Sequence, residues 1–164
     1  MRIESPVVIG RGDVLLKYPE LLDDYDPNLL PPQPYVAVHL HASHPSKIPP
    51  KEHILIEKLL AAGVRFVEVG NDVNSRPPMI LRLHIDVVKR ARKFIGTLSV
   101  FNVVAQIMEI PSFVLVDRSK AEPLVYRYMQ ANSAIVRAWN NCPPFGHFVP
   151  VEKIYQEAVE WAKI

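Results

Sequence analysis

The sequence predicts a single doubly wound α/β domain with a mostly parallel sheet of about four or five strands. Short apolar runs alternate along the chain with segments of helical periodicity, which is the order that parallel strands joined by helical crossovers require. The runs are apolar throughout instead of alternating with polar residues, as expected of strands that are buried on both faces. Several of the 16 prolines in this 164-residue chain cluster between these runs, and we interpret the clusters as element boundaries.

The first 33 residues form a segment distinct from the domain that follows. Two apolar stretches, 7–9 and 14–16, flank a glycine-containing turn, and this pattern predicts a short hairpin. An acidic stretch and a group of prolines after it predict a connector. We therefore divide the chain into an N-terminal extension with its linker, residues 1–33, and one α/β domain, residues 34–164.

The first half of the domain contains two apolar runs, each followed by a helical segment. Gly63 ends the first helical segment, because glycine readily takes the left-handed conformation that closes a helix. Four apolar residues of the second helical segment are expected on its buried side: Leu83, Val87, Val88 and Ala91. The expected elements are a strand at 35–42, a helix at 50–62, a strand at 64–69, a loop at 71–78 and a helix within 79–92.

The second half continues the same alternation. Ser99 is suited to cap a helix, because its hydroxyl can accept a hydrogen bond from an N–H of the first turn. The run at 112–116 is apolar enough for a fully buried strand, and the last segment is amphipathic. The expected elements are a short strand at 94–95 that ends at Gly96 and Thr97, a helix at 99–109, a strand at 112–116, a short helix at 121–129, a strand at 134–139 and a helix at 151–164.

Composition and charge limit the possible functions. Hydrophobic residues make up 49% of the chain and charged residues 22%, as in ordinary globular proteins. The net charge of +2 is too small to argue for nucleic acid by itself, and we interpret the basic cluster at 89–93 as a solvated helix end, so a nucleic-acid ligand is not expected. A single cysteine, Cys142, excludes an internal disulfide and favours a reducing compartment. With no leader-like N-terminus and no long apolar run, a cytoplasmic protein without a membrane span is expected.

Candidate binding residues follow the predicted strands, where parallel α/β sheets bind their ligands. Ser43 and Lys47 place a hydroxyl and an ammonium group near a helix start, and these groups can hold a phosphate oxygen. Asp72 follows the second strand, where a carboxylate can bind ribose hydroxyls. Thr97 and Ser99 lie where an anion meets the next helix N-terminus. Each pattern is equally compatible with a solvated loop, a turn or a plain helix cap.

Three histidines, His39, His41 and His44, gather at the end of the first predicted strand. His39 and His41 are two residues apart and are therefore expected to share a face, so a three-histidine zinc site is one interpretation. We favour hydrogen-bonded histidines instead, because His39 falls inside an apolar strand and no acidic residue is close in sequence. His41, at the strand end, is the candidate for catalytic chemistry. We expect neither a metal nor a cofactor.

The order of motifs carries a resemblance to a known family. The chain contains PYVAVHLHAS followed by Lys47, Pro49, Glu52 and a helix, and then LLAAGVRFVEVGND. Further on stand VVKRARKFIGTLSVFNVVAQIMEIPSFVLVD and the closing CPPFGHFVPVEKIYQEAVEWAKI. Over residues 34–164 this order resembles the nucleotide-sugar-binding half of the lipopolysaccharide heptosyltransferases, which have the GT-B glycosyltransferase fold. The resemblance implies a Rossmann-like domain that corresponds to one half of a GT-B fold.

The resemblance also implies roles for individual residues. Lys47 matches a lysine that contacts the donor phosphate, and Asp72 matches the position of a glutamate that holds the donor nucleoside. Ser99 matches a hydroxyl residue at the phosphate-facing helix start. Around it, where the family usually has an aspartate, a glycine and a histidine, the chain has Leu98, Val100 and Val103.

Two hypotheses of function follow. The first is a glycosyltransferase-like donor-binding domain that binds a nucleotide or a nucleotide-sugar. Any transfer would require a partner subunit or a second copy, because one half of this fold supplies only one wall of the reaction cleft. The second hypothesis is a non-catalytic α/β domain that serves assembly or partner binding, which the three departures and the N-terminal extension favour. A homo-oligomer or a partner subunit is expected under either hypothesis.

Overall fold

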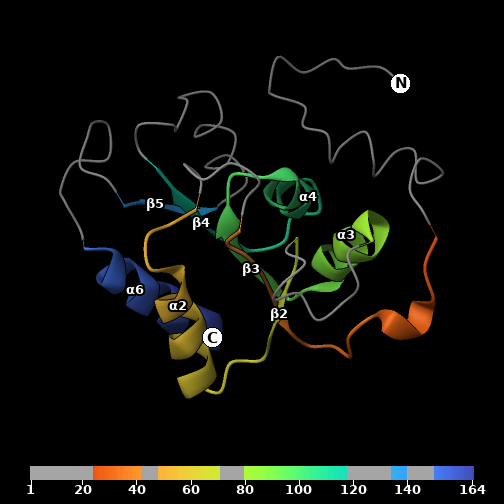
Figure 1. The fold of residues 1–164 in the computed structure, drawn as a ribbon, viewed down its shortest axis with the longest axis horizontal. Coiled ribbons are helices and arrows are strands. Elements are labelled where there is room, and N and C mark those ends of the chain that lie inside the picture. Colours follow the sequence, from red (N-terminus) through yellow and green to blue (C-terminus); the bar gives the residue numbers. More distant parts are fainter. Residues whose placement is uncertain (1–23, 42–47, 71–79, 118–133, 140–149) are drawn as a thin grey trace, which may run out of the picture.

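The structure is a computed structural model of the chain, and it describes residues 24–41, 48–70, 80–117, 134–139 and 150–164 (Figure 1). The predicted hairpin and the predicted helix at 121–129 lie outside these residues. Outside them also lie Ser43, His44, Lys47, Asp72 and Cys142. What the sequence predicts for these segments stays a prediction.

Five parallel strands form one sheet in the order β2-β1-β3-β4-β5. Their bounds are Val36–His39 for β1, Phe66–Glu68 for β2, Lys93–Thr97 for β3, Ser112–Val116 for β4 and Ile135–Ala138 for β5. Within β1, Val38 pairs with Glu68 of β2 on one side and with Ile95 of β3 on the other. The predicted doubly wound parallel sheet is therefore confirmed.

Helices cover both faces of the sheet (Figure 1). The helices α2 (Glu52–Ala61) and α6 (Val151–Lys163) pack on one face. The helices α3 (Leu81–Arg90) and α4 (Val100–Ile107) pack on the other, and a 3-10 helix, η2 (Pro27–Leu29), precedes β1. None of the described helices has the length and apolar character needed to cross a membrane.

The alternation of side chains along β1 explains the two layers. Tyr35 and Ala37 belong to the core beneath α3 and α4, whereas Val36 and Val38 belong to the core beneath α2 and α6. All four residues are buried. The apolar run is thus a strand covered on both faces, as the sequence predicts. The four residues expected to face inward from α3 and its end are also buried: Leu83, Val87, Val88 and Ala91.

Local chemistry sets several element boundaries. Gly63 follows α2 with φ +69°, the left-handed conformation expected of a glycine after a helix. Ser99 caps α4, as predicted. The strand expected at 35–42 is too long, because the last pairing of β1 joins His39 to Gly96 and the chain then leaves the sheet toward α2. Gly96 lies inside β3 and makes no turn, and a side chain there would collide with the ring of Phe94.

The described part of the N-terminal segment, residues 24–33, lies along α3. Its side chains contact three α3 residues that are successive turns apart, in the pairs Asp24–Arg82, Tyr25–Asp86 and Gln33–Arg90. Tyr25 and Leu30 also pack against the core on this side. The end of the predicted linker is therefore bound to the domain.

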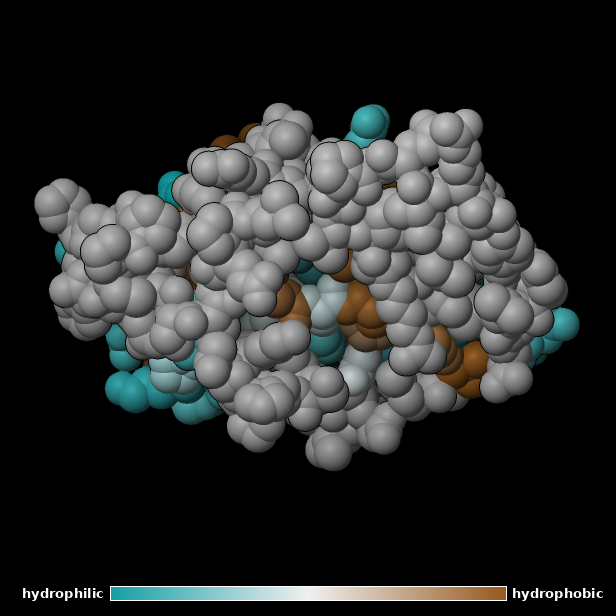
Figure 2. Space-filling model, turned by 90° about the horizontal axis from the view of Figure 1, so that it is seen from above, coloured by the Kyte–Doolittle hydropathy of each residue, from teal (hydrophilic) through white to brown (hydrophobic). Residues whose placement is uncertain are grey.

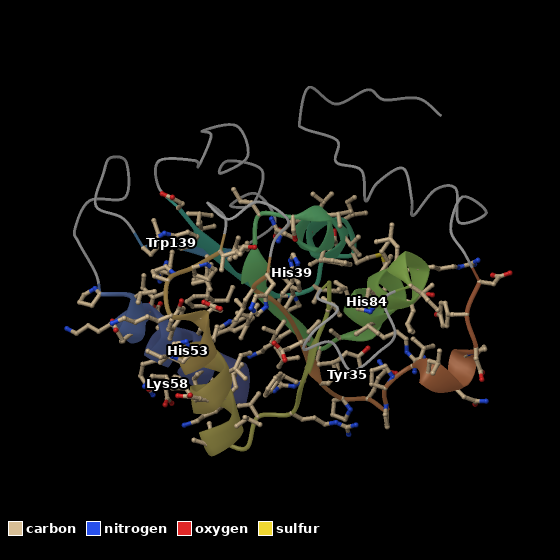
Figure 3. All side chains as sticks on the ribbon, viewed as in Figure 1. Tyr35, His39, His53, Lys58, His84 and Trp139 are labelled. Atoms are coloured by element: carbon tan, nitrogen blue, oxygen red, sulfur yellow. The ribbon has the colours of Figure 1, made fainter. Side chains whose placement is uncertain are left out.

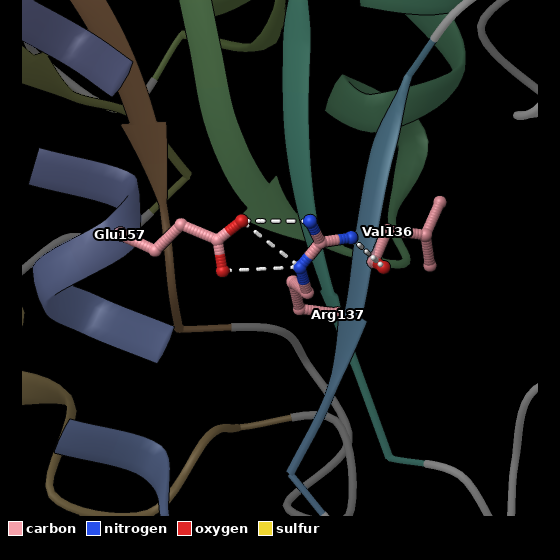
Figure 4. A network of polar contacts seen from close by, with 3 residues as sticks. All are labelled: Val136, Arg137 and Glu157. Carbon is pink, nitrogen blue, oxygen red and sulfur yellow. Dashed lines mark hydrogen bonds and ion pairs between the residues drawn. The ribbon is translucent and has the colours of Figure 1, made fainter. Parts of the chain in front are cut away.

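An ion pair links the last strand to the last helix (Figure 4). Arg137 of β5 binds Glu157 of α6, with 2.7 Å between Nη2 and Oε1 and with Nε 3.1 Å from each carboxylate oxygen. Arg137 Nη1 also donates a hydrogen bond to the carbonyl oxygen of Val136. The forked contact links α6 to β5, beside the buried packing of α6 on the sheet.

Candidate functional site at the β1/β3 switch point

The strand order creates one place where the connections diverge. After β1 the chain passes to α2 on one face of the sheet, and after β3 it passes to α4 on the other face. Doubly wound proteins bind ligands outside the carboxyl ends of two such strands. We call this region the switch point and define it as the end of β1 with His41 and the end of β3 with Ser99. Figure 2 views the molecule from above, and described apolar and polar residues lie side by side in its middle.

His39 and Ser99 meet at the switch point. His39 is the last residue of β1, and its Nδ1 lies 3.0 Å from Ser99 Oγ. The same Oγ accepts a hydrogen bond from the backbone N–H of Asn102 at 3.3 Å. Because the oxygen already accepts from Asn102, its hydroxyl proton is free to point toward His39 Nδ1. The start of α4 is thus tied to the end of β1 through one serine.

His39 is a buried, neutral histidine. Its side chain is enclosed in the protein, and the edge of its ring meets Phe101 with 4.9 Å between ring centroids. The pKa of His39 is lowered from 6.5 to about 4, chiefly by burial; a hydrogen bond to the backbone of His41 acts in the opposite direction, and the neighbouring His41 and His84 add to the lowering. His39 therefore brings no positive charge to the switch point at neutral pH.

A second buried histidine supports the first from α3 (Figure 3). The backbone N–H of Gly70, just after β2, donates a hydrogen bond to His84 Nδ1 at 2.7 Å. Gly70 has φ +78°, and a Cβ atom there would lie 2.6 Å from His39 Cδ2 and 2.6 Å from Phe101 Cε2. Only glycine fits this position, and its close approach fixes the ring of His39.

The side chain of Thr97 lies on the opposite face of the sheet from α4, the helix that Ser99 caps. Thr97 ends β3 and is fully buried, and its Oγ1 has no hydrogen-bond partner in the part of the chain that the structure describes. Strand alternation places its side chain on the same face as Ile95, which belongs to the core beneath α2 and α6. The two residues predicted to meet an anion together therefore lie on different sides of the switch point.

His41 points to the α2 layer. Its Nε2 lies 3.3 Å from Glu52 Oε1 at the start of α2, and about a quarter of its side chain is exposed, 27%. His39 contacts the start of α4 instead, so the expectation that these two histidines share a face is wrong. The reason is that β1 ends at His39, and strand alternation no longer applies beyond it. Within the described ranges, no three His, Cys, Asp or Glu residues gather as a metal would require.

Sequence reasoning found Ser99 as a helix cap but missed its contact with His39. Three of the predicted binding residues, Ser43, Lys47 and Asp72, lie outside the described residues. The position of His39 in the sequence indicated that it would make a polar contact, because a histidine at the end of an apolar strand needs a hydrogen-bond partner when it is buried. Its partner is 60 residues away in sequence, and the pattern alone does not identify it.

No family model matches the chain, and no curated protein matches it. Among solved structures, the chain is similar to TibC, a dodecameric iron-containing heptosyltransferase in complex with ADP-D-β-D-heptose. The identity is 18% and the TM-score is 0.43. The match covers 73% of this chain and 35% of TibC, so the chain spans well under half of that protein's length.

Proposed function

We propose that this chain is a glycosyltransferase-like donor-binding domain that binds a nucleotide or a nucleotide-sugar at the β1/β3 switch point. The observation that carries the proposal is the Ser99-capped start of α4 beside the end of β1, at the strand position where doubly wound sheets bind ligands. A helix N-terminus offers N–H groups and a positive dipole end to phosphate oxygens.

Four of the predicted binding residues hold the donor in this proposal: Ser99, Lys47, Ser43 and Asp72. The α4 start with Ser99 holds one phosphate group, and Lys47 supplies the cation that the neutral His39 does not. Ser43 supports the phosphate from the loop after β1, and Asp72 holds the ribose hydroxyls. The proposed donor is thus held from three strand ends.

Transfer is proposed to need a second copy of the chain or a partner subunit, which supplies the acceptor-binding wall. The reaction would be a direct displacement at the sugar, in which the α4 start and Lys47 stabilise the departing diphosphate. His41 is the candidate general base, because its partly exposed imidazole lies at the carboxyl edge and Glu52 orients it.

A thermal-shift screen with ADP, UDP and their sugar derivatives tests the proposal. Binding raises the melting temperature of the native protein. The variant Lys47→Ala is expected to abolish the rise, whereas Lys58→Ala is expected to keep it. Lys58 is the matched control, because it lies on α2 and binds Gln156 of α6, away from the switch point (Figure 3).

The absence of a shift with every one of these compounds would contradict the proposal. That result would favour the assembly role, for which the mass in solution and its change on deletion of residues 1–23 are the next measurements. A mass that corresponds to an oligomer and returns to the monomer on deletion would support assembly through the N-terminal segment.

A further inference from the structure

The hydroxyl of Thr97 is a buried polar group that is left unpaired by the part of the chain that the structure describes. The residue is fully buried, and no described residue forms a hydrogen bond with its Oγ1. Buried polar groups in native proteins almost always have a partner, so an exception at a strand end that faces a ligand-binding position calls for an explanation. Ser112 begins the neighbouring strand β4 and is also buried. It shows the usual state, because its Oγ donates a hydrogen bond to the carbonyl oxygen of Ile110 at 2.8 Å.

The described neighbours of Thr97 on its side of the sheet are aliphatic. Thr97 pairs with Leu115 of β4, and Leu40, just after β1, belongs to the same buried cluster as Leu115. Ile95 precedes Thr97 on the same face. These three neighbours belong to one buried cluster beneath α2 and α6. The medium around Oγ1 therefore has a low dielectric constant and offers no counter-charge among the neighbours named.

We infer that Thr97 binds a neutral oxygen of the donor's nucleoside, a ribose hydroxyl or a base carbonyl group, and does not bind the phosphate. The inference rests on the proposed function and assigns to this residue a different part of the same ligand. A phosphate against aliphatic walls would lose its hydration without gaining a cation, which is strongly unfavourable. A neutral oxygen pairs with the orphaned hydroxyl without that loss.

The two sides of the switch point then recognise different chemistry. The α4 side, with Ser99 and helix N–H groups, suits the anionic part of the ligand. The α2 side, with Thr97, suits an uncharged polar part. Because Thr97 has no exposed surface in the free protein, the ligand reaches it only when the switch point opens locally.

The isosteric variant Thr97→Val tests the inference with two readouts of opposite sign. In the free protein, loss of an unpartnered hydroxyl is expected to raise the melting temperature by about 2–4 °C. Affinity for ADP or UDP, measured by calorimetry, is expected to fall about tenfold. Affinity for inorganic pyrophosphate, which has no neutral oxygen group to offer, is expected to stay as in the native protein.

Two further variants serve as controls. Thr97→Ser keeps the hydroxyl and is expected to keep the affinity for ADP or UDP while it lowers the melting temperature through the lost methyl group. Ser112→Ala removes a hydroxyl that has a partner, and it is expected to lower the melting temperature and to leave both affinities unchanged.

The outcomes separate the inference from the proposed function. If native protein binds neither nucleotides nor pyrophosphate, the proposed function fails and this inference fails with it. If native protein binds ADP or UDP and Thr97→Val binds them equally well, the inference alone is wrong. It is also wrong if Thr97→Val lowers the melting temperature of the free protein, or if it weakens pyrophosphate binding as much as nucleotide binding.

Discussion

His39 Nδ1 and Ser99 Oγ lie 3.0 Å apart, although 60 residues separate them in the sequence. The contact joins the end of β1 to the start of α4 at the switch point of the sheet. Ser99 thereby has two roles at once, since it also caps α4. The helix start proposed to hold phosphate is consequently positioned by a buried histidine that itself stays neutral.

The neutral state of His39 predicts a loss of stability in mild acid. The unfolded chain binds a proton on this histidine as the pH falls below 6.5, whereas the native protein binds it only near 4. At this residue the unfolded state therefore binds more protons in this range, and the contribution of His39 to the free energy of unfolding falls from pH 6.5 to 4 by about 3 kcal/mol at most. Urea unfolding at several pH values measures this decrease in the free energy of unfolding.

The variant His39→Asn has no titrating imidazole at this position. Its free energy of unfolding is therefore expected to depend less on pH, by the contribution of about one proton. His53→Asn is the control, because His53 lies exposed on α2 and its replacement should leave the slope as it is (Figure 3). An unchanged slope in His39→Asn would show that His39 takes no part in the acid sensitivity.

Two glycines with positive φ should respond very differently to alanine. At Gly63 a Cβ atom would meet nothing within 4 Å, so only the left-handed backbone is penalised, by about 1 kcal/mol. At Gly70 the Cβ atom would also collide with His39 and Phe101 at 2.6 Å. Gly70→Ala should therefore reduce the free energy of unfolding by roughly 3 kcal/mol or more. Equal losses in chemical denaturation would contradict the packing described around His39.

The sequence predicts those parts of this fold that depend on nearby residues. The cap at Ser99, the helix end at Gly63 and the two-sided burial of β1 follow from local hydrogen bonding, backbone freedom and apolar pattern. Their physical causes lie within a few residues of each position. The described strands and helices accordingly lie close to where the periodicity places them.

The site was less predictable because it depends on contacts between distant segments. The contacts of His39 with Ser99 and Phe101 arise only when β1 and β3 become neighbours in the sheet. The point where β1 ends, which turns His41 toward Glu52, likewise depends on pairing with Gly96. The sequence alone does not show that β1 ends at His39. Strand alternation, continued past this residue, therefore placed His39 and His41 on one face, which is wrong.

The ion pair between Arg137 and Glu157 should contribute modestly to stability. Both side chains are about half exposed, at 43% and 44%, so solvent screens the attraction. A double-mutant cycle with alanine at both positions is expected to give a coupling of about 0.5–1 kcal/mol. Because salt screens exposed charges, the coupling should decrease in about 1 M NaCl. A coupling independent of salt would show that packing, and not charge, links β5 to α6.

Replacement of Ser99 by aspartate should separate helix capping from ligand binding. Aspartate caps helices about as well as serine, so Ser99→Asp is expected to keep most of the native free energy of unfolding, whereas Ser99→Ala loses about 1 kcal/mol. The carboxylate then stands where a phosphate is proposed to bind, and it should abolish the thermal shift with ADP and UDP by repulsion. It also lies beside His39, where a negative charge raises the pKa of the imidazole. Ser99→Asp should consequently lose less stability than the native protein between pH 6.5 and 4. A variant that is stable yet still binds both nucleotides would place the phosphate away from the α4 start.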